Sequence, residues 1–302
     1  MRKRLSSGAP LILALLLTGC TLSPLARHTA DFSSATTLVV DNSENAFRAA
    51  VRLHQQAQAA RLVARYDSPN PIDPHTLEPL ISPEGLSTRT TILEGLRCYA
   101  QALADISGGV SSKSLDDASA ATGNNLLGLS QAITAAKPIG FTLSQSQANV
   151  ASTALNALGQ FLTSQKIKSS VPKVIAEMDP NIDAITKILS SDIATLRNQA
   201  GLDYEQMLDE QDRFIRRAGK DIPPTERRAE IQQLPKILAD KQATDDMLAD
   251  LDRCVQQLAQ THHALAASAG KKDASSLKAR IAELNAIGQR LSNYYQSLPS
   301  GS

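Results

Sequence analysis

The chain has 302 residues, with 31 basic and 30 acidic side chains and a formal net charge of +1 at pH 7. This balance, without an arginine-rich tail, argues against the basic surface that nucleic-acid-binding proteins need. Hydrophobic residues make up 42% of the chain, but aromatic residues make up 3% and tryptophan is absent. Apolar positions filled by Ala, Leu, Ile and Val suit the seams between packed helices better than an aromatic-lined pocket.

The first twenty residues have three distinct parts. Three cations, Arg2, Lys3 and Arg4, precede an apolar run over residues 9–17, which is too short for a stable membrane span. The run ends in Leu17-Thr18-Gly19-Cys20. A positive start, a short apolar segment and small residues predict a secretory signal over residues 1–19.

The four residues that end at Cys20 resemble the lipobox of bacterial lipoproteins. The resemblance implies that residues 1–19 are removed and that Cys20 carries diacylglycerol on its sulfur and an acyl chain on its new amine. Thr21 stands where an aspartate marks inner-membrane retention in enteric-type lipoproteins, so the resemblance implies the outer membrane, with the body facing the periplasm. The resemblance covers these residues alone.

The segment after the lipobox is polar, with Pro24 and many Ser and Thr residues. This composition predicts a lipidated flexible tether over residues 20–41. Asp41 or Ser43 is then suited to cap the first helix of a helical bundle domain over residues 42–302. After that helix, five prolines between residues 68 and 83 predict a stiff, extended strap.

The next helix is expected from about Thr88 to Ile106, where Gly108-Gly109 follows. The stretch 118–165 after it is unusual, because Lys137 is its only charged residue. We interpret it as a helical hairpin with a turn at residues 137–140, covered by its own bundle or by a partner. An alternative is insertion of this hairpin into a bilayer, although its many amides and hydroxyls disfavour a spontaneous span.

Helical periodicity resumes at Val171 and continues past Phe214, with a break or kink expected at Asp179-Pro180. The chain turns between Gly219 and Pro224. A basic cluster surrounds this turn and is a candidate binding site for anionic lipid, cell-wall polymer or a partner; the other interpretation is solvated charge that pairs with the acidic residues just before it. The cluster comprises Arg213, Arg216, Arg217, Lys220, Arg227 and Arg228.

The return helix and the last helix carry apolar residues at heptad-like spacing, and Cys254 lies in the stripe of the return helix. With Cys20 assigned to lipid, Cys98 and Cys254 are the remaining thiols. Two thiols in an exported protein favour a disulfide, so we predict a Cys98–Cys254 bridge.

No catalytic or metal-binding constellation stands out from the sequence. His262 and His263 are adjacent and point about 100 degrees apart on a helix, so they do not form an i, i+4 metal pair. Ser170 and Lys173 match the short Ser-x-x-Lys pattern of penicillin-binding enzymes, but the Lys-Thr-Gly partner is missing. We therefore expect no enzyme activity, no metal and no cofactor.

Together these observations predict an all-α, elongated antiparallel helical bundle with coiled-coil-like seams. We expect a lipid-anchored, non-enzymatic envelope protein that binds or braces another envelope component. The expected partner is another envelope protein. A nucleic-acid partner or a small-molecule ligand is not expected. The alternative is a membrane-active protein that inserts its uncharged hairpin, residues 118–165.

Overall fold

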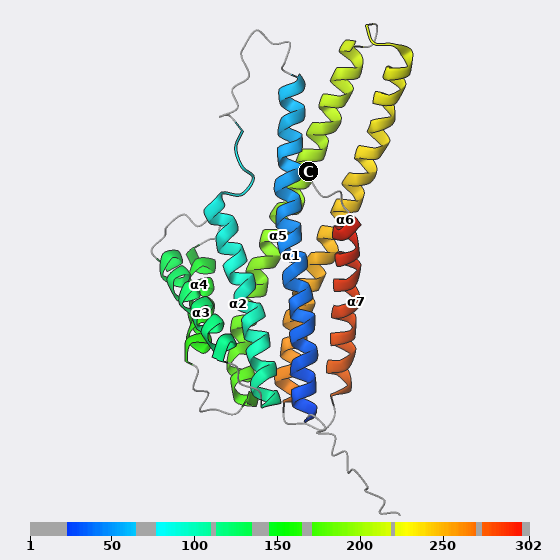
Figure 1. Ribbon diagram of the computed structural model, residues 1–302. Helices are drawn as coiled ribbons and strands as arrows, with labels where there is room; N and C mark the ends of the chain where they lie inside the picture. The colour runs from blue at the N-terminus through cyan, green and yellow to red at the C-terminus, as the bar shows by residue number, and fades with distance from the viewer. Residues whose placement is uncertain are drawn as a thin grey trace, which may run out of the picture.

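The computed structural model describes residues 23–64, 77–109, 113–134, 145–164, 171–218, 221–269 and 274–297, and the structural statements below refer to these residues. They form seven helices and no strand, which confirms the all-α prediction, and the body is elongated (Figure 1). The helices are α1 (Pro24–Ala64), α2 (Pro83–Gly108), α3 (Lys113–Thr134), α4 (Gln145–Thr163), α5 (Val171–Ala218), α6 (Pro224–Ser268) and α7 (Ser275–Ser297). Residues 1–22, with the predicted signal and Cys20, lie outside the described residues.

Helix α1 is the central helix and packs against α2, α5, α6 and α7. Ser23 caps it by accepting a hydrogen bond from the Ala26 N–H at 3.1 Å. Phe32, Val39 and Val40 are buried in its first half. The prediction of a flexible tether is therefore wrong for residues 24–41, and so is the prediction that this helix begins at Asp41 or Ser43.

The hydroxyl residues that suggested a tether are satisfied within α1 itself. Thr36 donates to the carbonyl of Phe32 at 2.8 Å, and Ser43 donates to the carbonyl of Val39 at 2.8 Å. Such hydrogen bonds remove the cost of burying a hydroxyl, so burial of the neighbouring apolar side chains overrides the weak helix propensity of Ser and Thr.

Helix α2 begins and ends with clear signals. Ser82 accepts a hydrogen bond from the Gly85 N–H at 3.0 Å, and Pro83 occupies the first turn. Gly109 ends the helix with a φ of 70°, a left-handed conformation that favours glycine. The helix thus begins five residues before the predicted start, while residues 77–82 of the predicted strap are not helical.

Helices α3 and α4 form the hairpin expected from the uncharged stretch, and they pack against α2 and α5. The predicted turn at residues 137–140 lies outside the described residues. The two helices cross at Gly123 and Gly159, where a Cβ on either residue would lie 2.8 Å from the carbonyl oxygen of the other. One face of the hairpin is covered by its own chain, through buried residues such as Leu126, Leu155 and Leu158.

Helices α5 and α6 form the longest pair, with 48 and 45 residues, so each is about 70 Å long. Helix α5 continues through Asp179 and Pro180, so of the predicted break or kink the break is wrong. A proline in a helix removes one backbone hydrogen bond and strains the preceding turn, and packing along α4 and α6 compensates here. The apolar residues at helical spacing in α5 are buried: Ile182, Ile185, Leu189, Ile193 and Leu196.

Helix α7 runs parallel to α1 and antiparallel to α6. Gly288 allows α1 to approach closely, since a Cβ there would lie 3.2 Å from the Cβ of Leu38. Asn42 of α1 is buried at this contact and donates from Nδ2 to the carbonyl of Gly288 at 2.9 Å. Gly288 therefore permits a close contact between α7 and α1.

Candidate interaction surface

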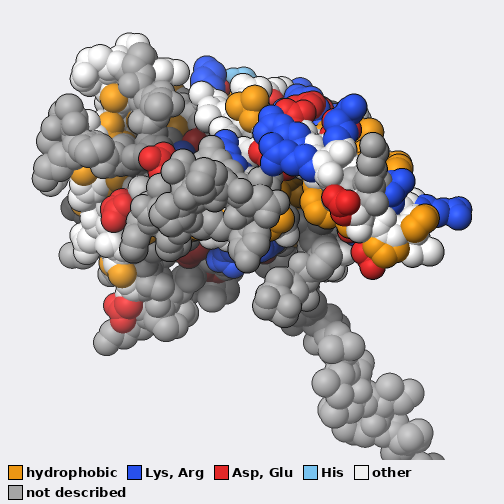
Figure 2. Space-filling view, turned by 90° about the horizontal axis from the view of Figure 1, so that it is seen from above, with side chains coloured by type: hydrophobic (Ala, Val, Ile, Leu, Met, Phe, Trp, Pro, Cys, Tyr) orange, Lys and Arg blue, Asp and Glu red, His pale blue; other side chains and the backbone are white. Residues whose placement is uncertain are grey.

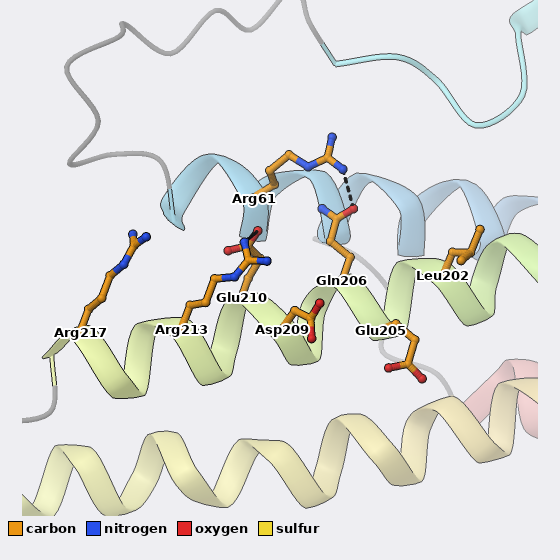
Figure 3. A pocket seen from close by; sticks show the side chains of 8 residues that line it. All are labelled: Arg61, Leu202, Glu205, Gln206, Asp209, Glu210, Arg213 and Arg217. Atoms are coloured by element: carbon orange, nitrogen blue, oxygen red, sulfur yellow. Dashed lines mark hydrogen bonds and ion pairs between the residues drawn. The ribbon is translucent and has the colours of Figure 1, made fainter.

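The far ends of α5 and α6 form a hairpin beyond the main core, and we call residues 204–247 the distal hairpin. Between Asp203 and Leu248, none of the described side chains is fully buried. Polar contacts join its two helices: Tyr204 contacts Thr244 at 2.9 Å, Gln211 donates to Glu230 at 2.8 Å, and Lys241 pairs with Glu205. At this end α5 lies between α1 and α6 (Figure 3).

The predicted basic cluster lies at the tip of the distal hairpin, and most of its described charges have local partners. Arg213 pairs with Glu210 at 3.1 Å, and Arg216 pairs with Asp212 at 2.6 Å. For Arg213 and Arg216, these pairs agree with the interpretation that the cluster pairs with the acidic residues just before it. Because the pairs are exposed, each contributes little to stability.

The remaining members of the cluster are placed differently. Arg227 turns back to donate to the carbonyl of Ile222 at 3.4 Å, and Arg228 is exposed. Arg217 lines a groove, described next, and Lys220 lies outside the described residues. Figure 2, which views this end, shows Lys and Arg side chains gathered together with acidic and hydrophobic side chains among them.

A polar groove of about 580 Å³ runs along α5 beside the end of α1 (Figure 3). Arg61 of α1 donates to Gln206 of α5 at 3.0 Å, and Gln206 donates to the carbonyl of Ala57 at 2.8 Å, so these contacts fix the wall of the groove. Glu210 Oε2 is buried there and accepts no hydrogen bond. The groove is lined by Arg61, Leu202, Glu205, Gln206, Asp209, Glu210, Arg213 and Arg217.

Exposed apolar side chains are concentrated at the same end. Among the described residues with large exposed apolar side chains, Leu77, Ile106 and Val150 lie elsewhere. The other five lie on the distal hairpin or beside it: Val63, Leu202, Phe214, Ile231 and Leu238. Apolar side chains within a field of charged groups are typical of a protein-binding surface.

A buried polar network joins α2, α5 and α6 near the other end of the bundle. Asp179 accepts from His262 Nδ1 at 2.8 Å and from His263 Nδ1 at 2.7 Å, one histidine on each carboxylate oxygen. His262 Nε2 accepts from the Tyr99 hydroxyl at 2.8 Å. The hydrogen bond from His262 is the main cause that lowers the pKa of Asp179 below its usual value.

This network has the order of a proton relay; Tyr99 and His262 are enclosed, whereas His263 is exposed. Tyr99 is 1% exposed and His262 is 0% exposed. The ring of Phe161 packs edge-on to Tyr99, and Phe32 packs edge-on to His262. Burial raises the pKa of Tyr99 well above its usual value, so its hydroxyl stays a hydrogen-bond donor. The arrangement links α2, α5 and α6 through hydrogen bonds.

Asp179 and the two histidines were missed as a group by the sequence analysis. In the sequence, Asp179 indicated only a break or kink, and the histidines were considered only as metal ligands. His262 follows Leu258 by four residues and precedes Leu265 by three, so the heptad spacing of α6 already placed it in the buried stripe.

The predicted Cys98–Cys254 disulfide is wrong, because both thiols are free. Cys98 lies on α2 and Cys254 on α6, and no Cα of one helix lies within 8 Å of a Cα of the other. A disulfide needs a Cα separation below about 7 Å. Burial raises the pKa of Cys98 to about 11 and that of Cys254 to about 12, so both are protonated core residues. Heptad position indicated a seam for Cys254 but did not identify which helix lies across it.

Within the described residues, no group of three or more His, Cys, Asp or Glu side chains is arranged to hold a metal ion. None of the described helices has the length and hydrophobicity needed to cross a membrane.

Comparison with known proteins adds no family. No protein-family model, curated protein or solved structure is significantly similar to this chain. The fold and the distal hairpin therefore define the class, an all-α bundle with an exposed helical hairpin at one end.

Proposed function

We propose that this chain is a lipid-anchored, non-enzymatic protein of the bacterial envelope that binds another envelope protein through its distal hairpin. The main support for this proposal is that the start of α1 and the distal hairpin lie at opposite ends of the bundle. Helix α1 begins at Pro24, at the end of the bundle opposite the distal hairpin (Figure 1). The three residues from Cys20 to Ser23 span at most about 11 Å.

With a lipid on Cys20, this geometry places the start of α1, and not the distal hairpin, next to the membrane. The anchor holds the start of α1 close to the bilayer, and α5 extends about 70 Å toward the other end. The basic cluster then faces away from the membrane that holds the anchor, which favours a protein partner over the head groups of that membrane. With Thr21 after the lipidated cysteine, the outer membrane is the proposed location, with the distal hairpin in the periplasm.

The chemistry of the distal hairpin supports a protein partner. The groove beside α1 offers guanidinium and carboxylate groups together. Phe214 and Leu202 supply exposed apolar area near these charges. A surface that combines apolar anchors with pairable charges suits a polypeptide better than a small ligand, which is usually enclosed in an apolar pocket.

The anchor is tested by mass spectrometry of the amino-terminal peptide of the full chain produced in a Gram-negative host. We expect the mature chain to begin at Cys20 with acyl groups attached, and Cys20→Ala to remain unacylated. An unmodified Cys20 in the mature protein would contradict the anchor.

The partner surface is tested by a photo-crosslinking amino acid placed at Phe214 or at Leu202 of the anchored chain. We expect both positions to give an adduct with the same envelope protein, identified by mass spectrometry. Val150 is the matched control, because it is equally exposed on α4 but lies outside the distal hairpin. Adducts of equal yield from Val150, or none from either test position, would contradict the assignment.

A further inference from the structure

A series of hydrogen bonds joins α5, α1 and the segment before α2. Nδ1 of His54, on α1, lies 2.9 and 3.1 Å from the two carboxylate oxygens of Asp203, on α5. Nε2 of the same ring lies 2.6 Å from Nε2 of Gln58, one turn further along α1. That nitrogen of Gln58 also donates to the backbone carbonyl of Glu78 at 2.6 Å. The series thus runs from a buried carboxylate to an exposed segment.

The two ends of the series decide where its protons lie. A carbonyl oxygen only accepts, so Gln58 must present its NH2 group to Glu78. The two hydrogens of that group are directed to the carbonyl of Glu78 and to Nε2 of His54. Nε2 therefore accepts and carries no proton. The single proton of the neutral ring is on Nδ1, which donates it to the carboxylate of Asp203.

The entry segment, residues 77–81, has two kinds of attachment to the bundle. Leu80 and Ile81 are partly buried and pack against the core. Among the described residues, the hydrogen bond from Gln58 to Glu78 is the one polar contact that ties this segment to another helix. The first part of the entry segment is exposed, so its position on α1 depends on that hydrogen bond.

We propose that protonation of His54 releases the first part of the entry segment from α1, which makes this contact a pH-dependent switch. Histidine ordinarily changes charge between about pH 5 and 8, and the side chain of His54 is 17% exposed to the solvent that supplies the proton. The added proton binds Nε2, so two donors then face each other across 2.6 Å. Gln58 relieves this contact by turning its amide, so that Oε1 accepts a charge-assisted hydrogen bond from the ring. Its NH2 group then turns away from the carbonyl of Glu78.

Protonation has the opposite effect on the contact between α1 and α5. The ring of His54 becomes a cation beside the carboxylate of Asp203, so this hydrogen bond becomes stronger. Gln206, one turn beyond Asp203, keeps its hydrogen bond to Ala57 and holds the wall of the polar groove. The switch therefore changes the surface of α1 near the groove and leaves α1 packed on α5.

The charges around His54 do not offer a second group for this response. In the described part of the chain, Asp203 is in direct contact with His54, and α2, α6 and α7 bring no charged side chain into hydrogen-bond or ion-pair contact with it. Carboxylate and guanidinium groups do not ordinarily titrate between about pH 5 and 8, so His54 carries the response. Of the other charges on these elements, Arg52, Glu78 and Glu84 are exposed, Arg61 donates to Gln206, Glu205 pairs with Lys241, Arg197 pairs with Asp245, and Arg290 pairs with Asp250.

NMR of the histidine ring nitrogens in the Cys20→Ala chain tests the neutral state. At about pH 8, His54 should carry its proton on Nδ1 and none on Nε2, because Gln58 donates to Nε2. The signals of His54 are assigned by their loss in His54→Gln. A proton on Nε2 at this pH would overturn the proposal.

A spin label at the exposed Leu77 tests the release. In the Cys20→Ala chain with Leu77→Cys, the ratio of immobilised to mobile label should fall about fivefold from about pH 8 to about pH 5, as expected for the loss of one hydrogen bond. Gln58→Glu has the same shape but lacks the donor, so the label should be mobile at both pH values. His54→Gln should remove the pH dependence. The Cys20→Ala chain without Leu77→Cys measures any labelling of the buried thiols.

Two other histidines serve as controls, with circular dichroism to confirm that each variant is helical. His75→Gln removes the histidine that is nearest to the entry segment in the sequence and lies outside the described residues. His263→Gln removes an exposed histidine of α6. Both variants should retain the response of the label. A response that is lost in His75→Gln, that persists in His54→Gln, or that is absent from the parent chain would overturn the proposal.

Discussion

The effect of replacing glycine by alanine can be compared at two positions of α3, one at the crossing with α4 and one with open space around it. Gly123 and Gly128 both lie within α3, and both can be replaced by alanine. At Gly123 the new Cβ would lie 2.8 Å from the carbonyl oxygen of Gly159 and 3.0 Å from the Cβ of Leu162. At Gly128 no atom lies within 4 Å of the new Cβ.

Both variants gain the same stability from the helix propensity of alanine, so this contribution cancels when their free energies of unfolding are compared. Replacing glycine by alanine inside a helix contributes about 1 kcal/mol of stability, which Gly128→Ala should show in full. Overpacking against a backbone carbonyl costs about 1–3 kcal/mol. Gly123→Ala should therefore be about 1–3 kcal/mol less stable than Gly128→Ala, and neutral to about 2 kcal/mol less stable than the parent chain.

Urea denaturation of the two variants and the parent chain, followed by circular dichroism at the helix band, measures this difference. The midpoint should rise for Gly128→Ala and fall or stay unchanged for Gly123→Ala, with the slope unchanged. Gly159→Ala should resemble Gly123→Ala, because its Cβ would meet the carbonyl oxygen of Gly123. Equal stabilisation by all three substitutions would refute the close crossing of α3 and α4.

Four other outcomes are expected. Asp192→Asn should lower the free energy of unfolding by about 3–5 kcal/mol, because the buried Arg89 guanidinium loses its bidentate carboxylate partner. The double variant Arg89→Met/Asp192→Leu should lower the free energy of unfolding much less in the same denaturation assay, because it removes both charges. The pKa of Asp179 is lower in the folded chain than in the unfolded chain, so its carboxylate stabilises the fold above about pH 4. This stabilisation is lost as the pH falls through the pKa that Asp179 has in the folded chain. The stability difference between the parent and Asp179→Asn should thus shrink between about pH 5 and pH 2, and a constant difference would exclude this role. In a Cys20→Ala chain, Cys98 and Cys254 should not react with a thiol reagent at about pH 8 until urea unfolds the protein, and an intact mass two hydrogens lower would indicate the disulfide after all. The full chain should release no dye from anionic phospholipid vesicles, because Leu155 and Leu158 are held inside the bundle; leakage would favour insertion of the uncharged hairpin.

The seams of the bundle were predictable because their spacing is a local property of the sequence. Ile185 and Leu251 each belong to a stripe with steps of three and four residues, and such a stripe has one structural solution, a helix with a buried face. The pairing of Arg213 with Glu210 and of Arg216 with Asp212 was also accessible, since both pairs lie within one helical turn.

The errors arose where a long-range contact decides the outcome. Thr36 and its neighbours have a loop-like composition, and they become helical because Phe32 and Val39 are buried by distant helices. Pro180 is a strong local signal for a break, but the packing of α5 on its neighbours overrides it. The partner of Cys254 could not be deduced, because periodicity identifies the face of a helix and not the helix that covers it.

The unbroken course of α5 gives the molecule a mechanical property. Helix α5 runs without an intervening loop from the side of Pro24 to the distal hairpin and packs on α1 and α6, so its two ends are joined by continuous helix. A push or pull on one end is therefore transmitted as a tilt of the whole body, so the chain is suited to act as a strut of fixed length.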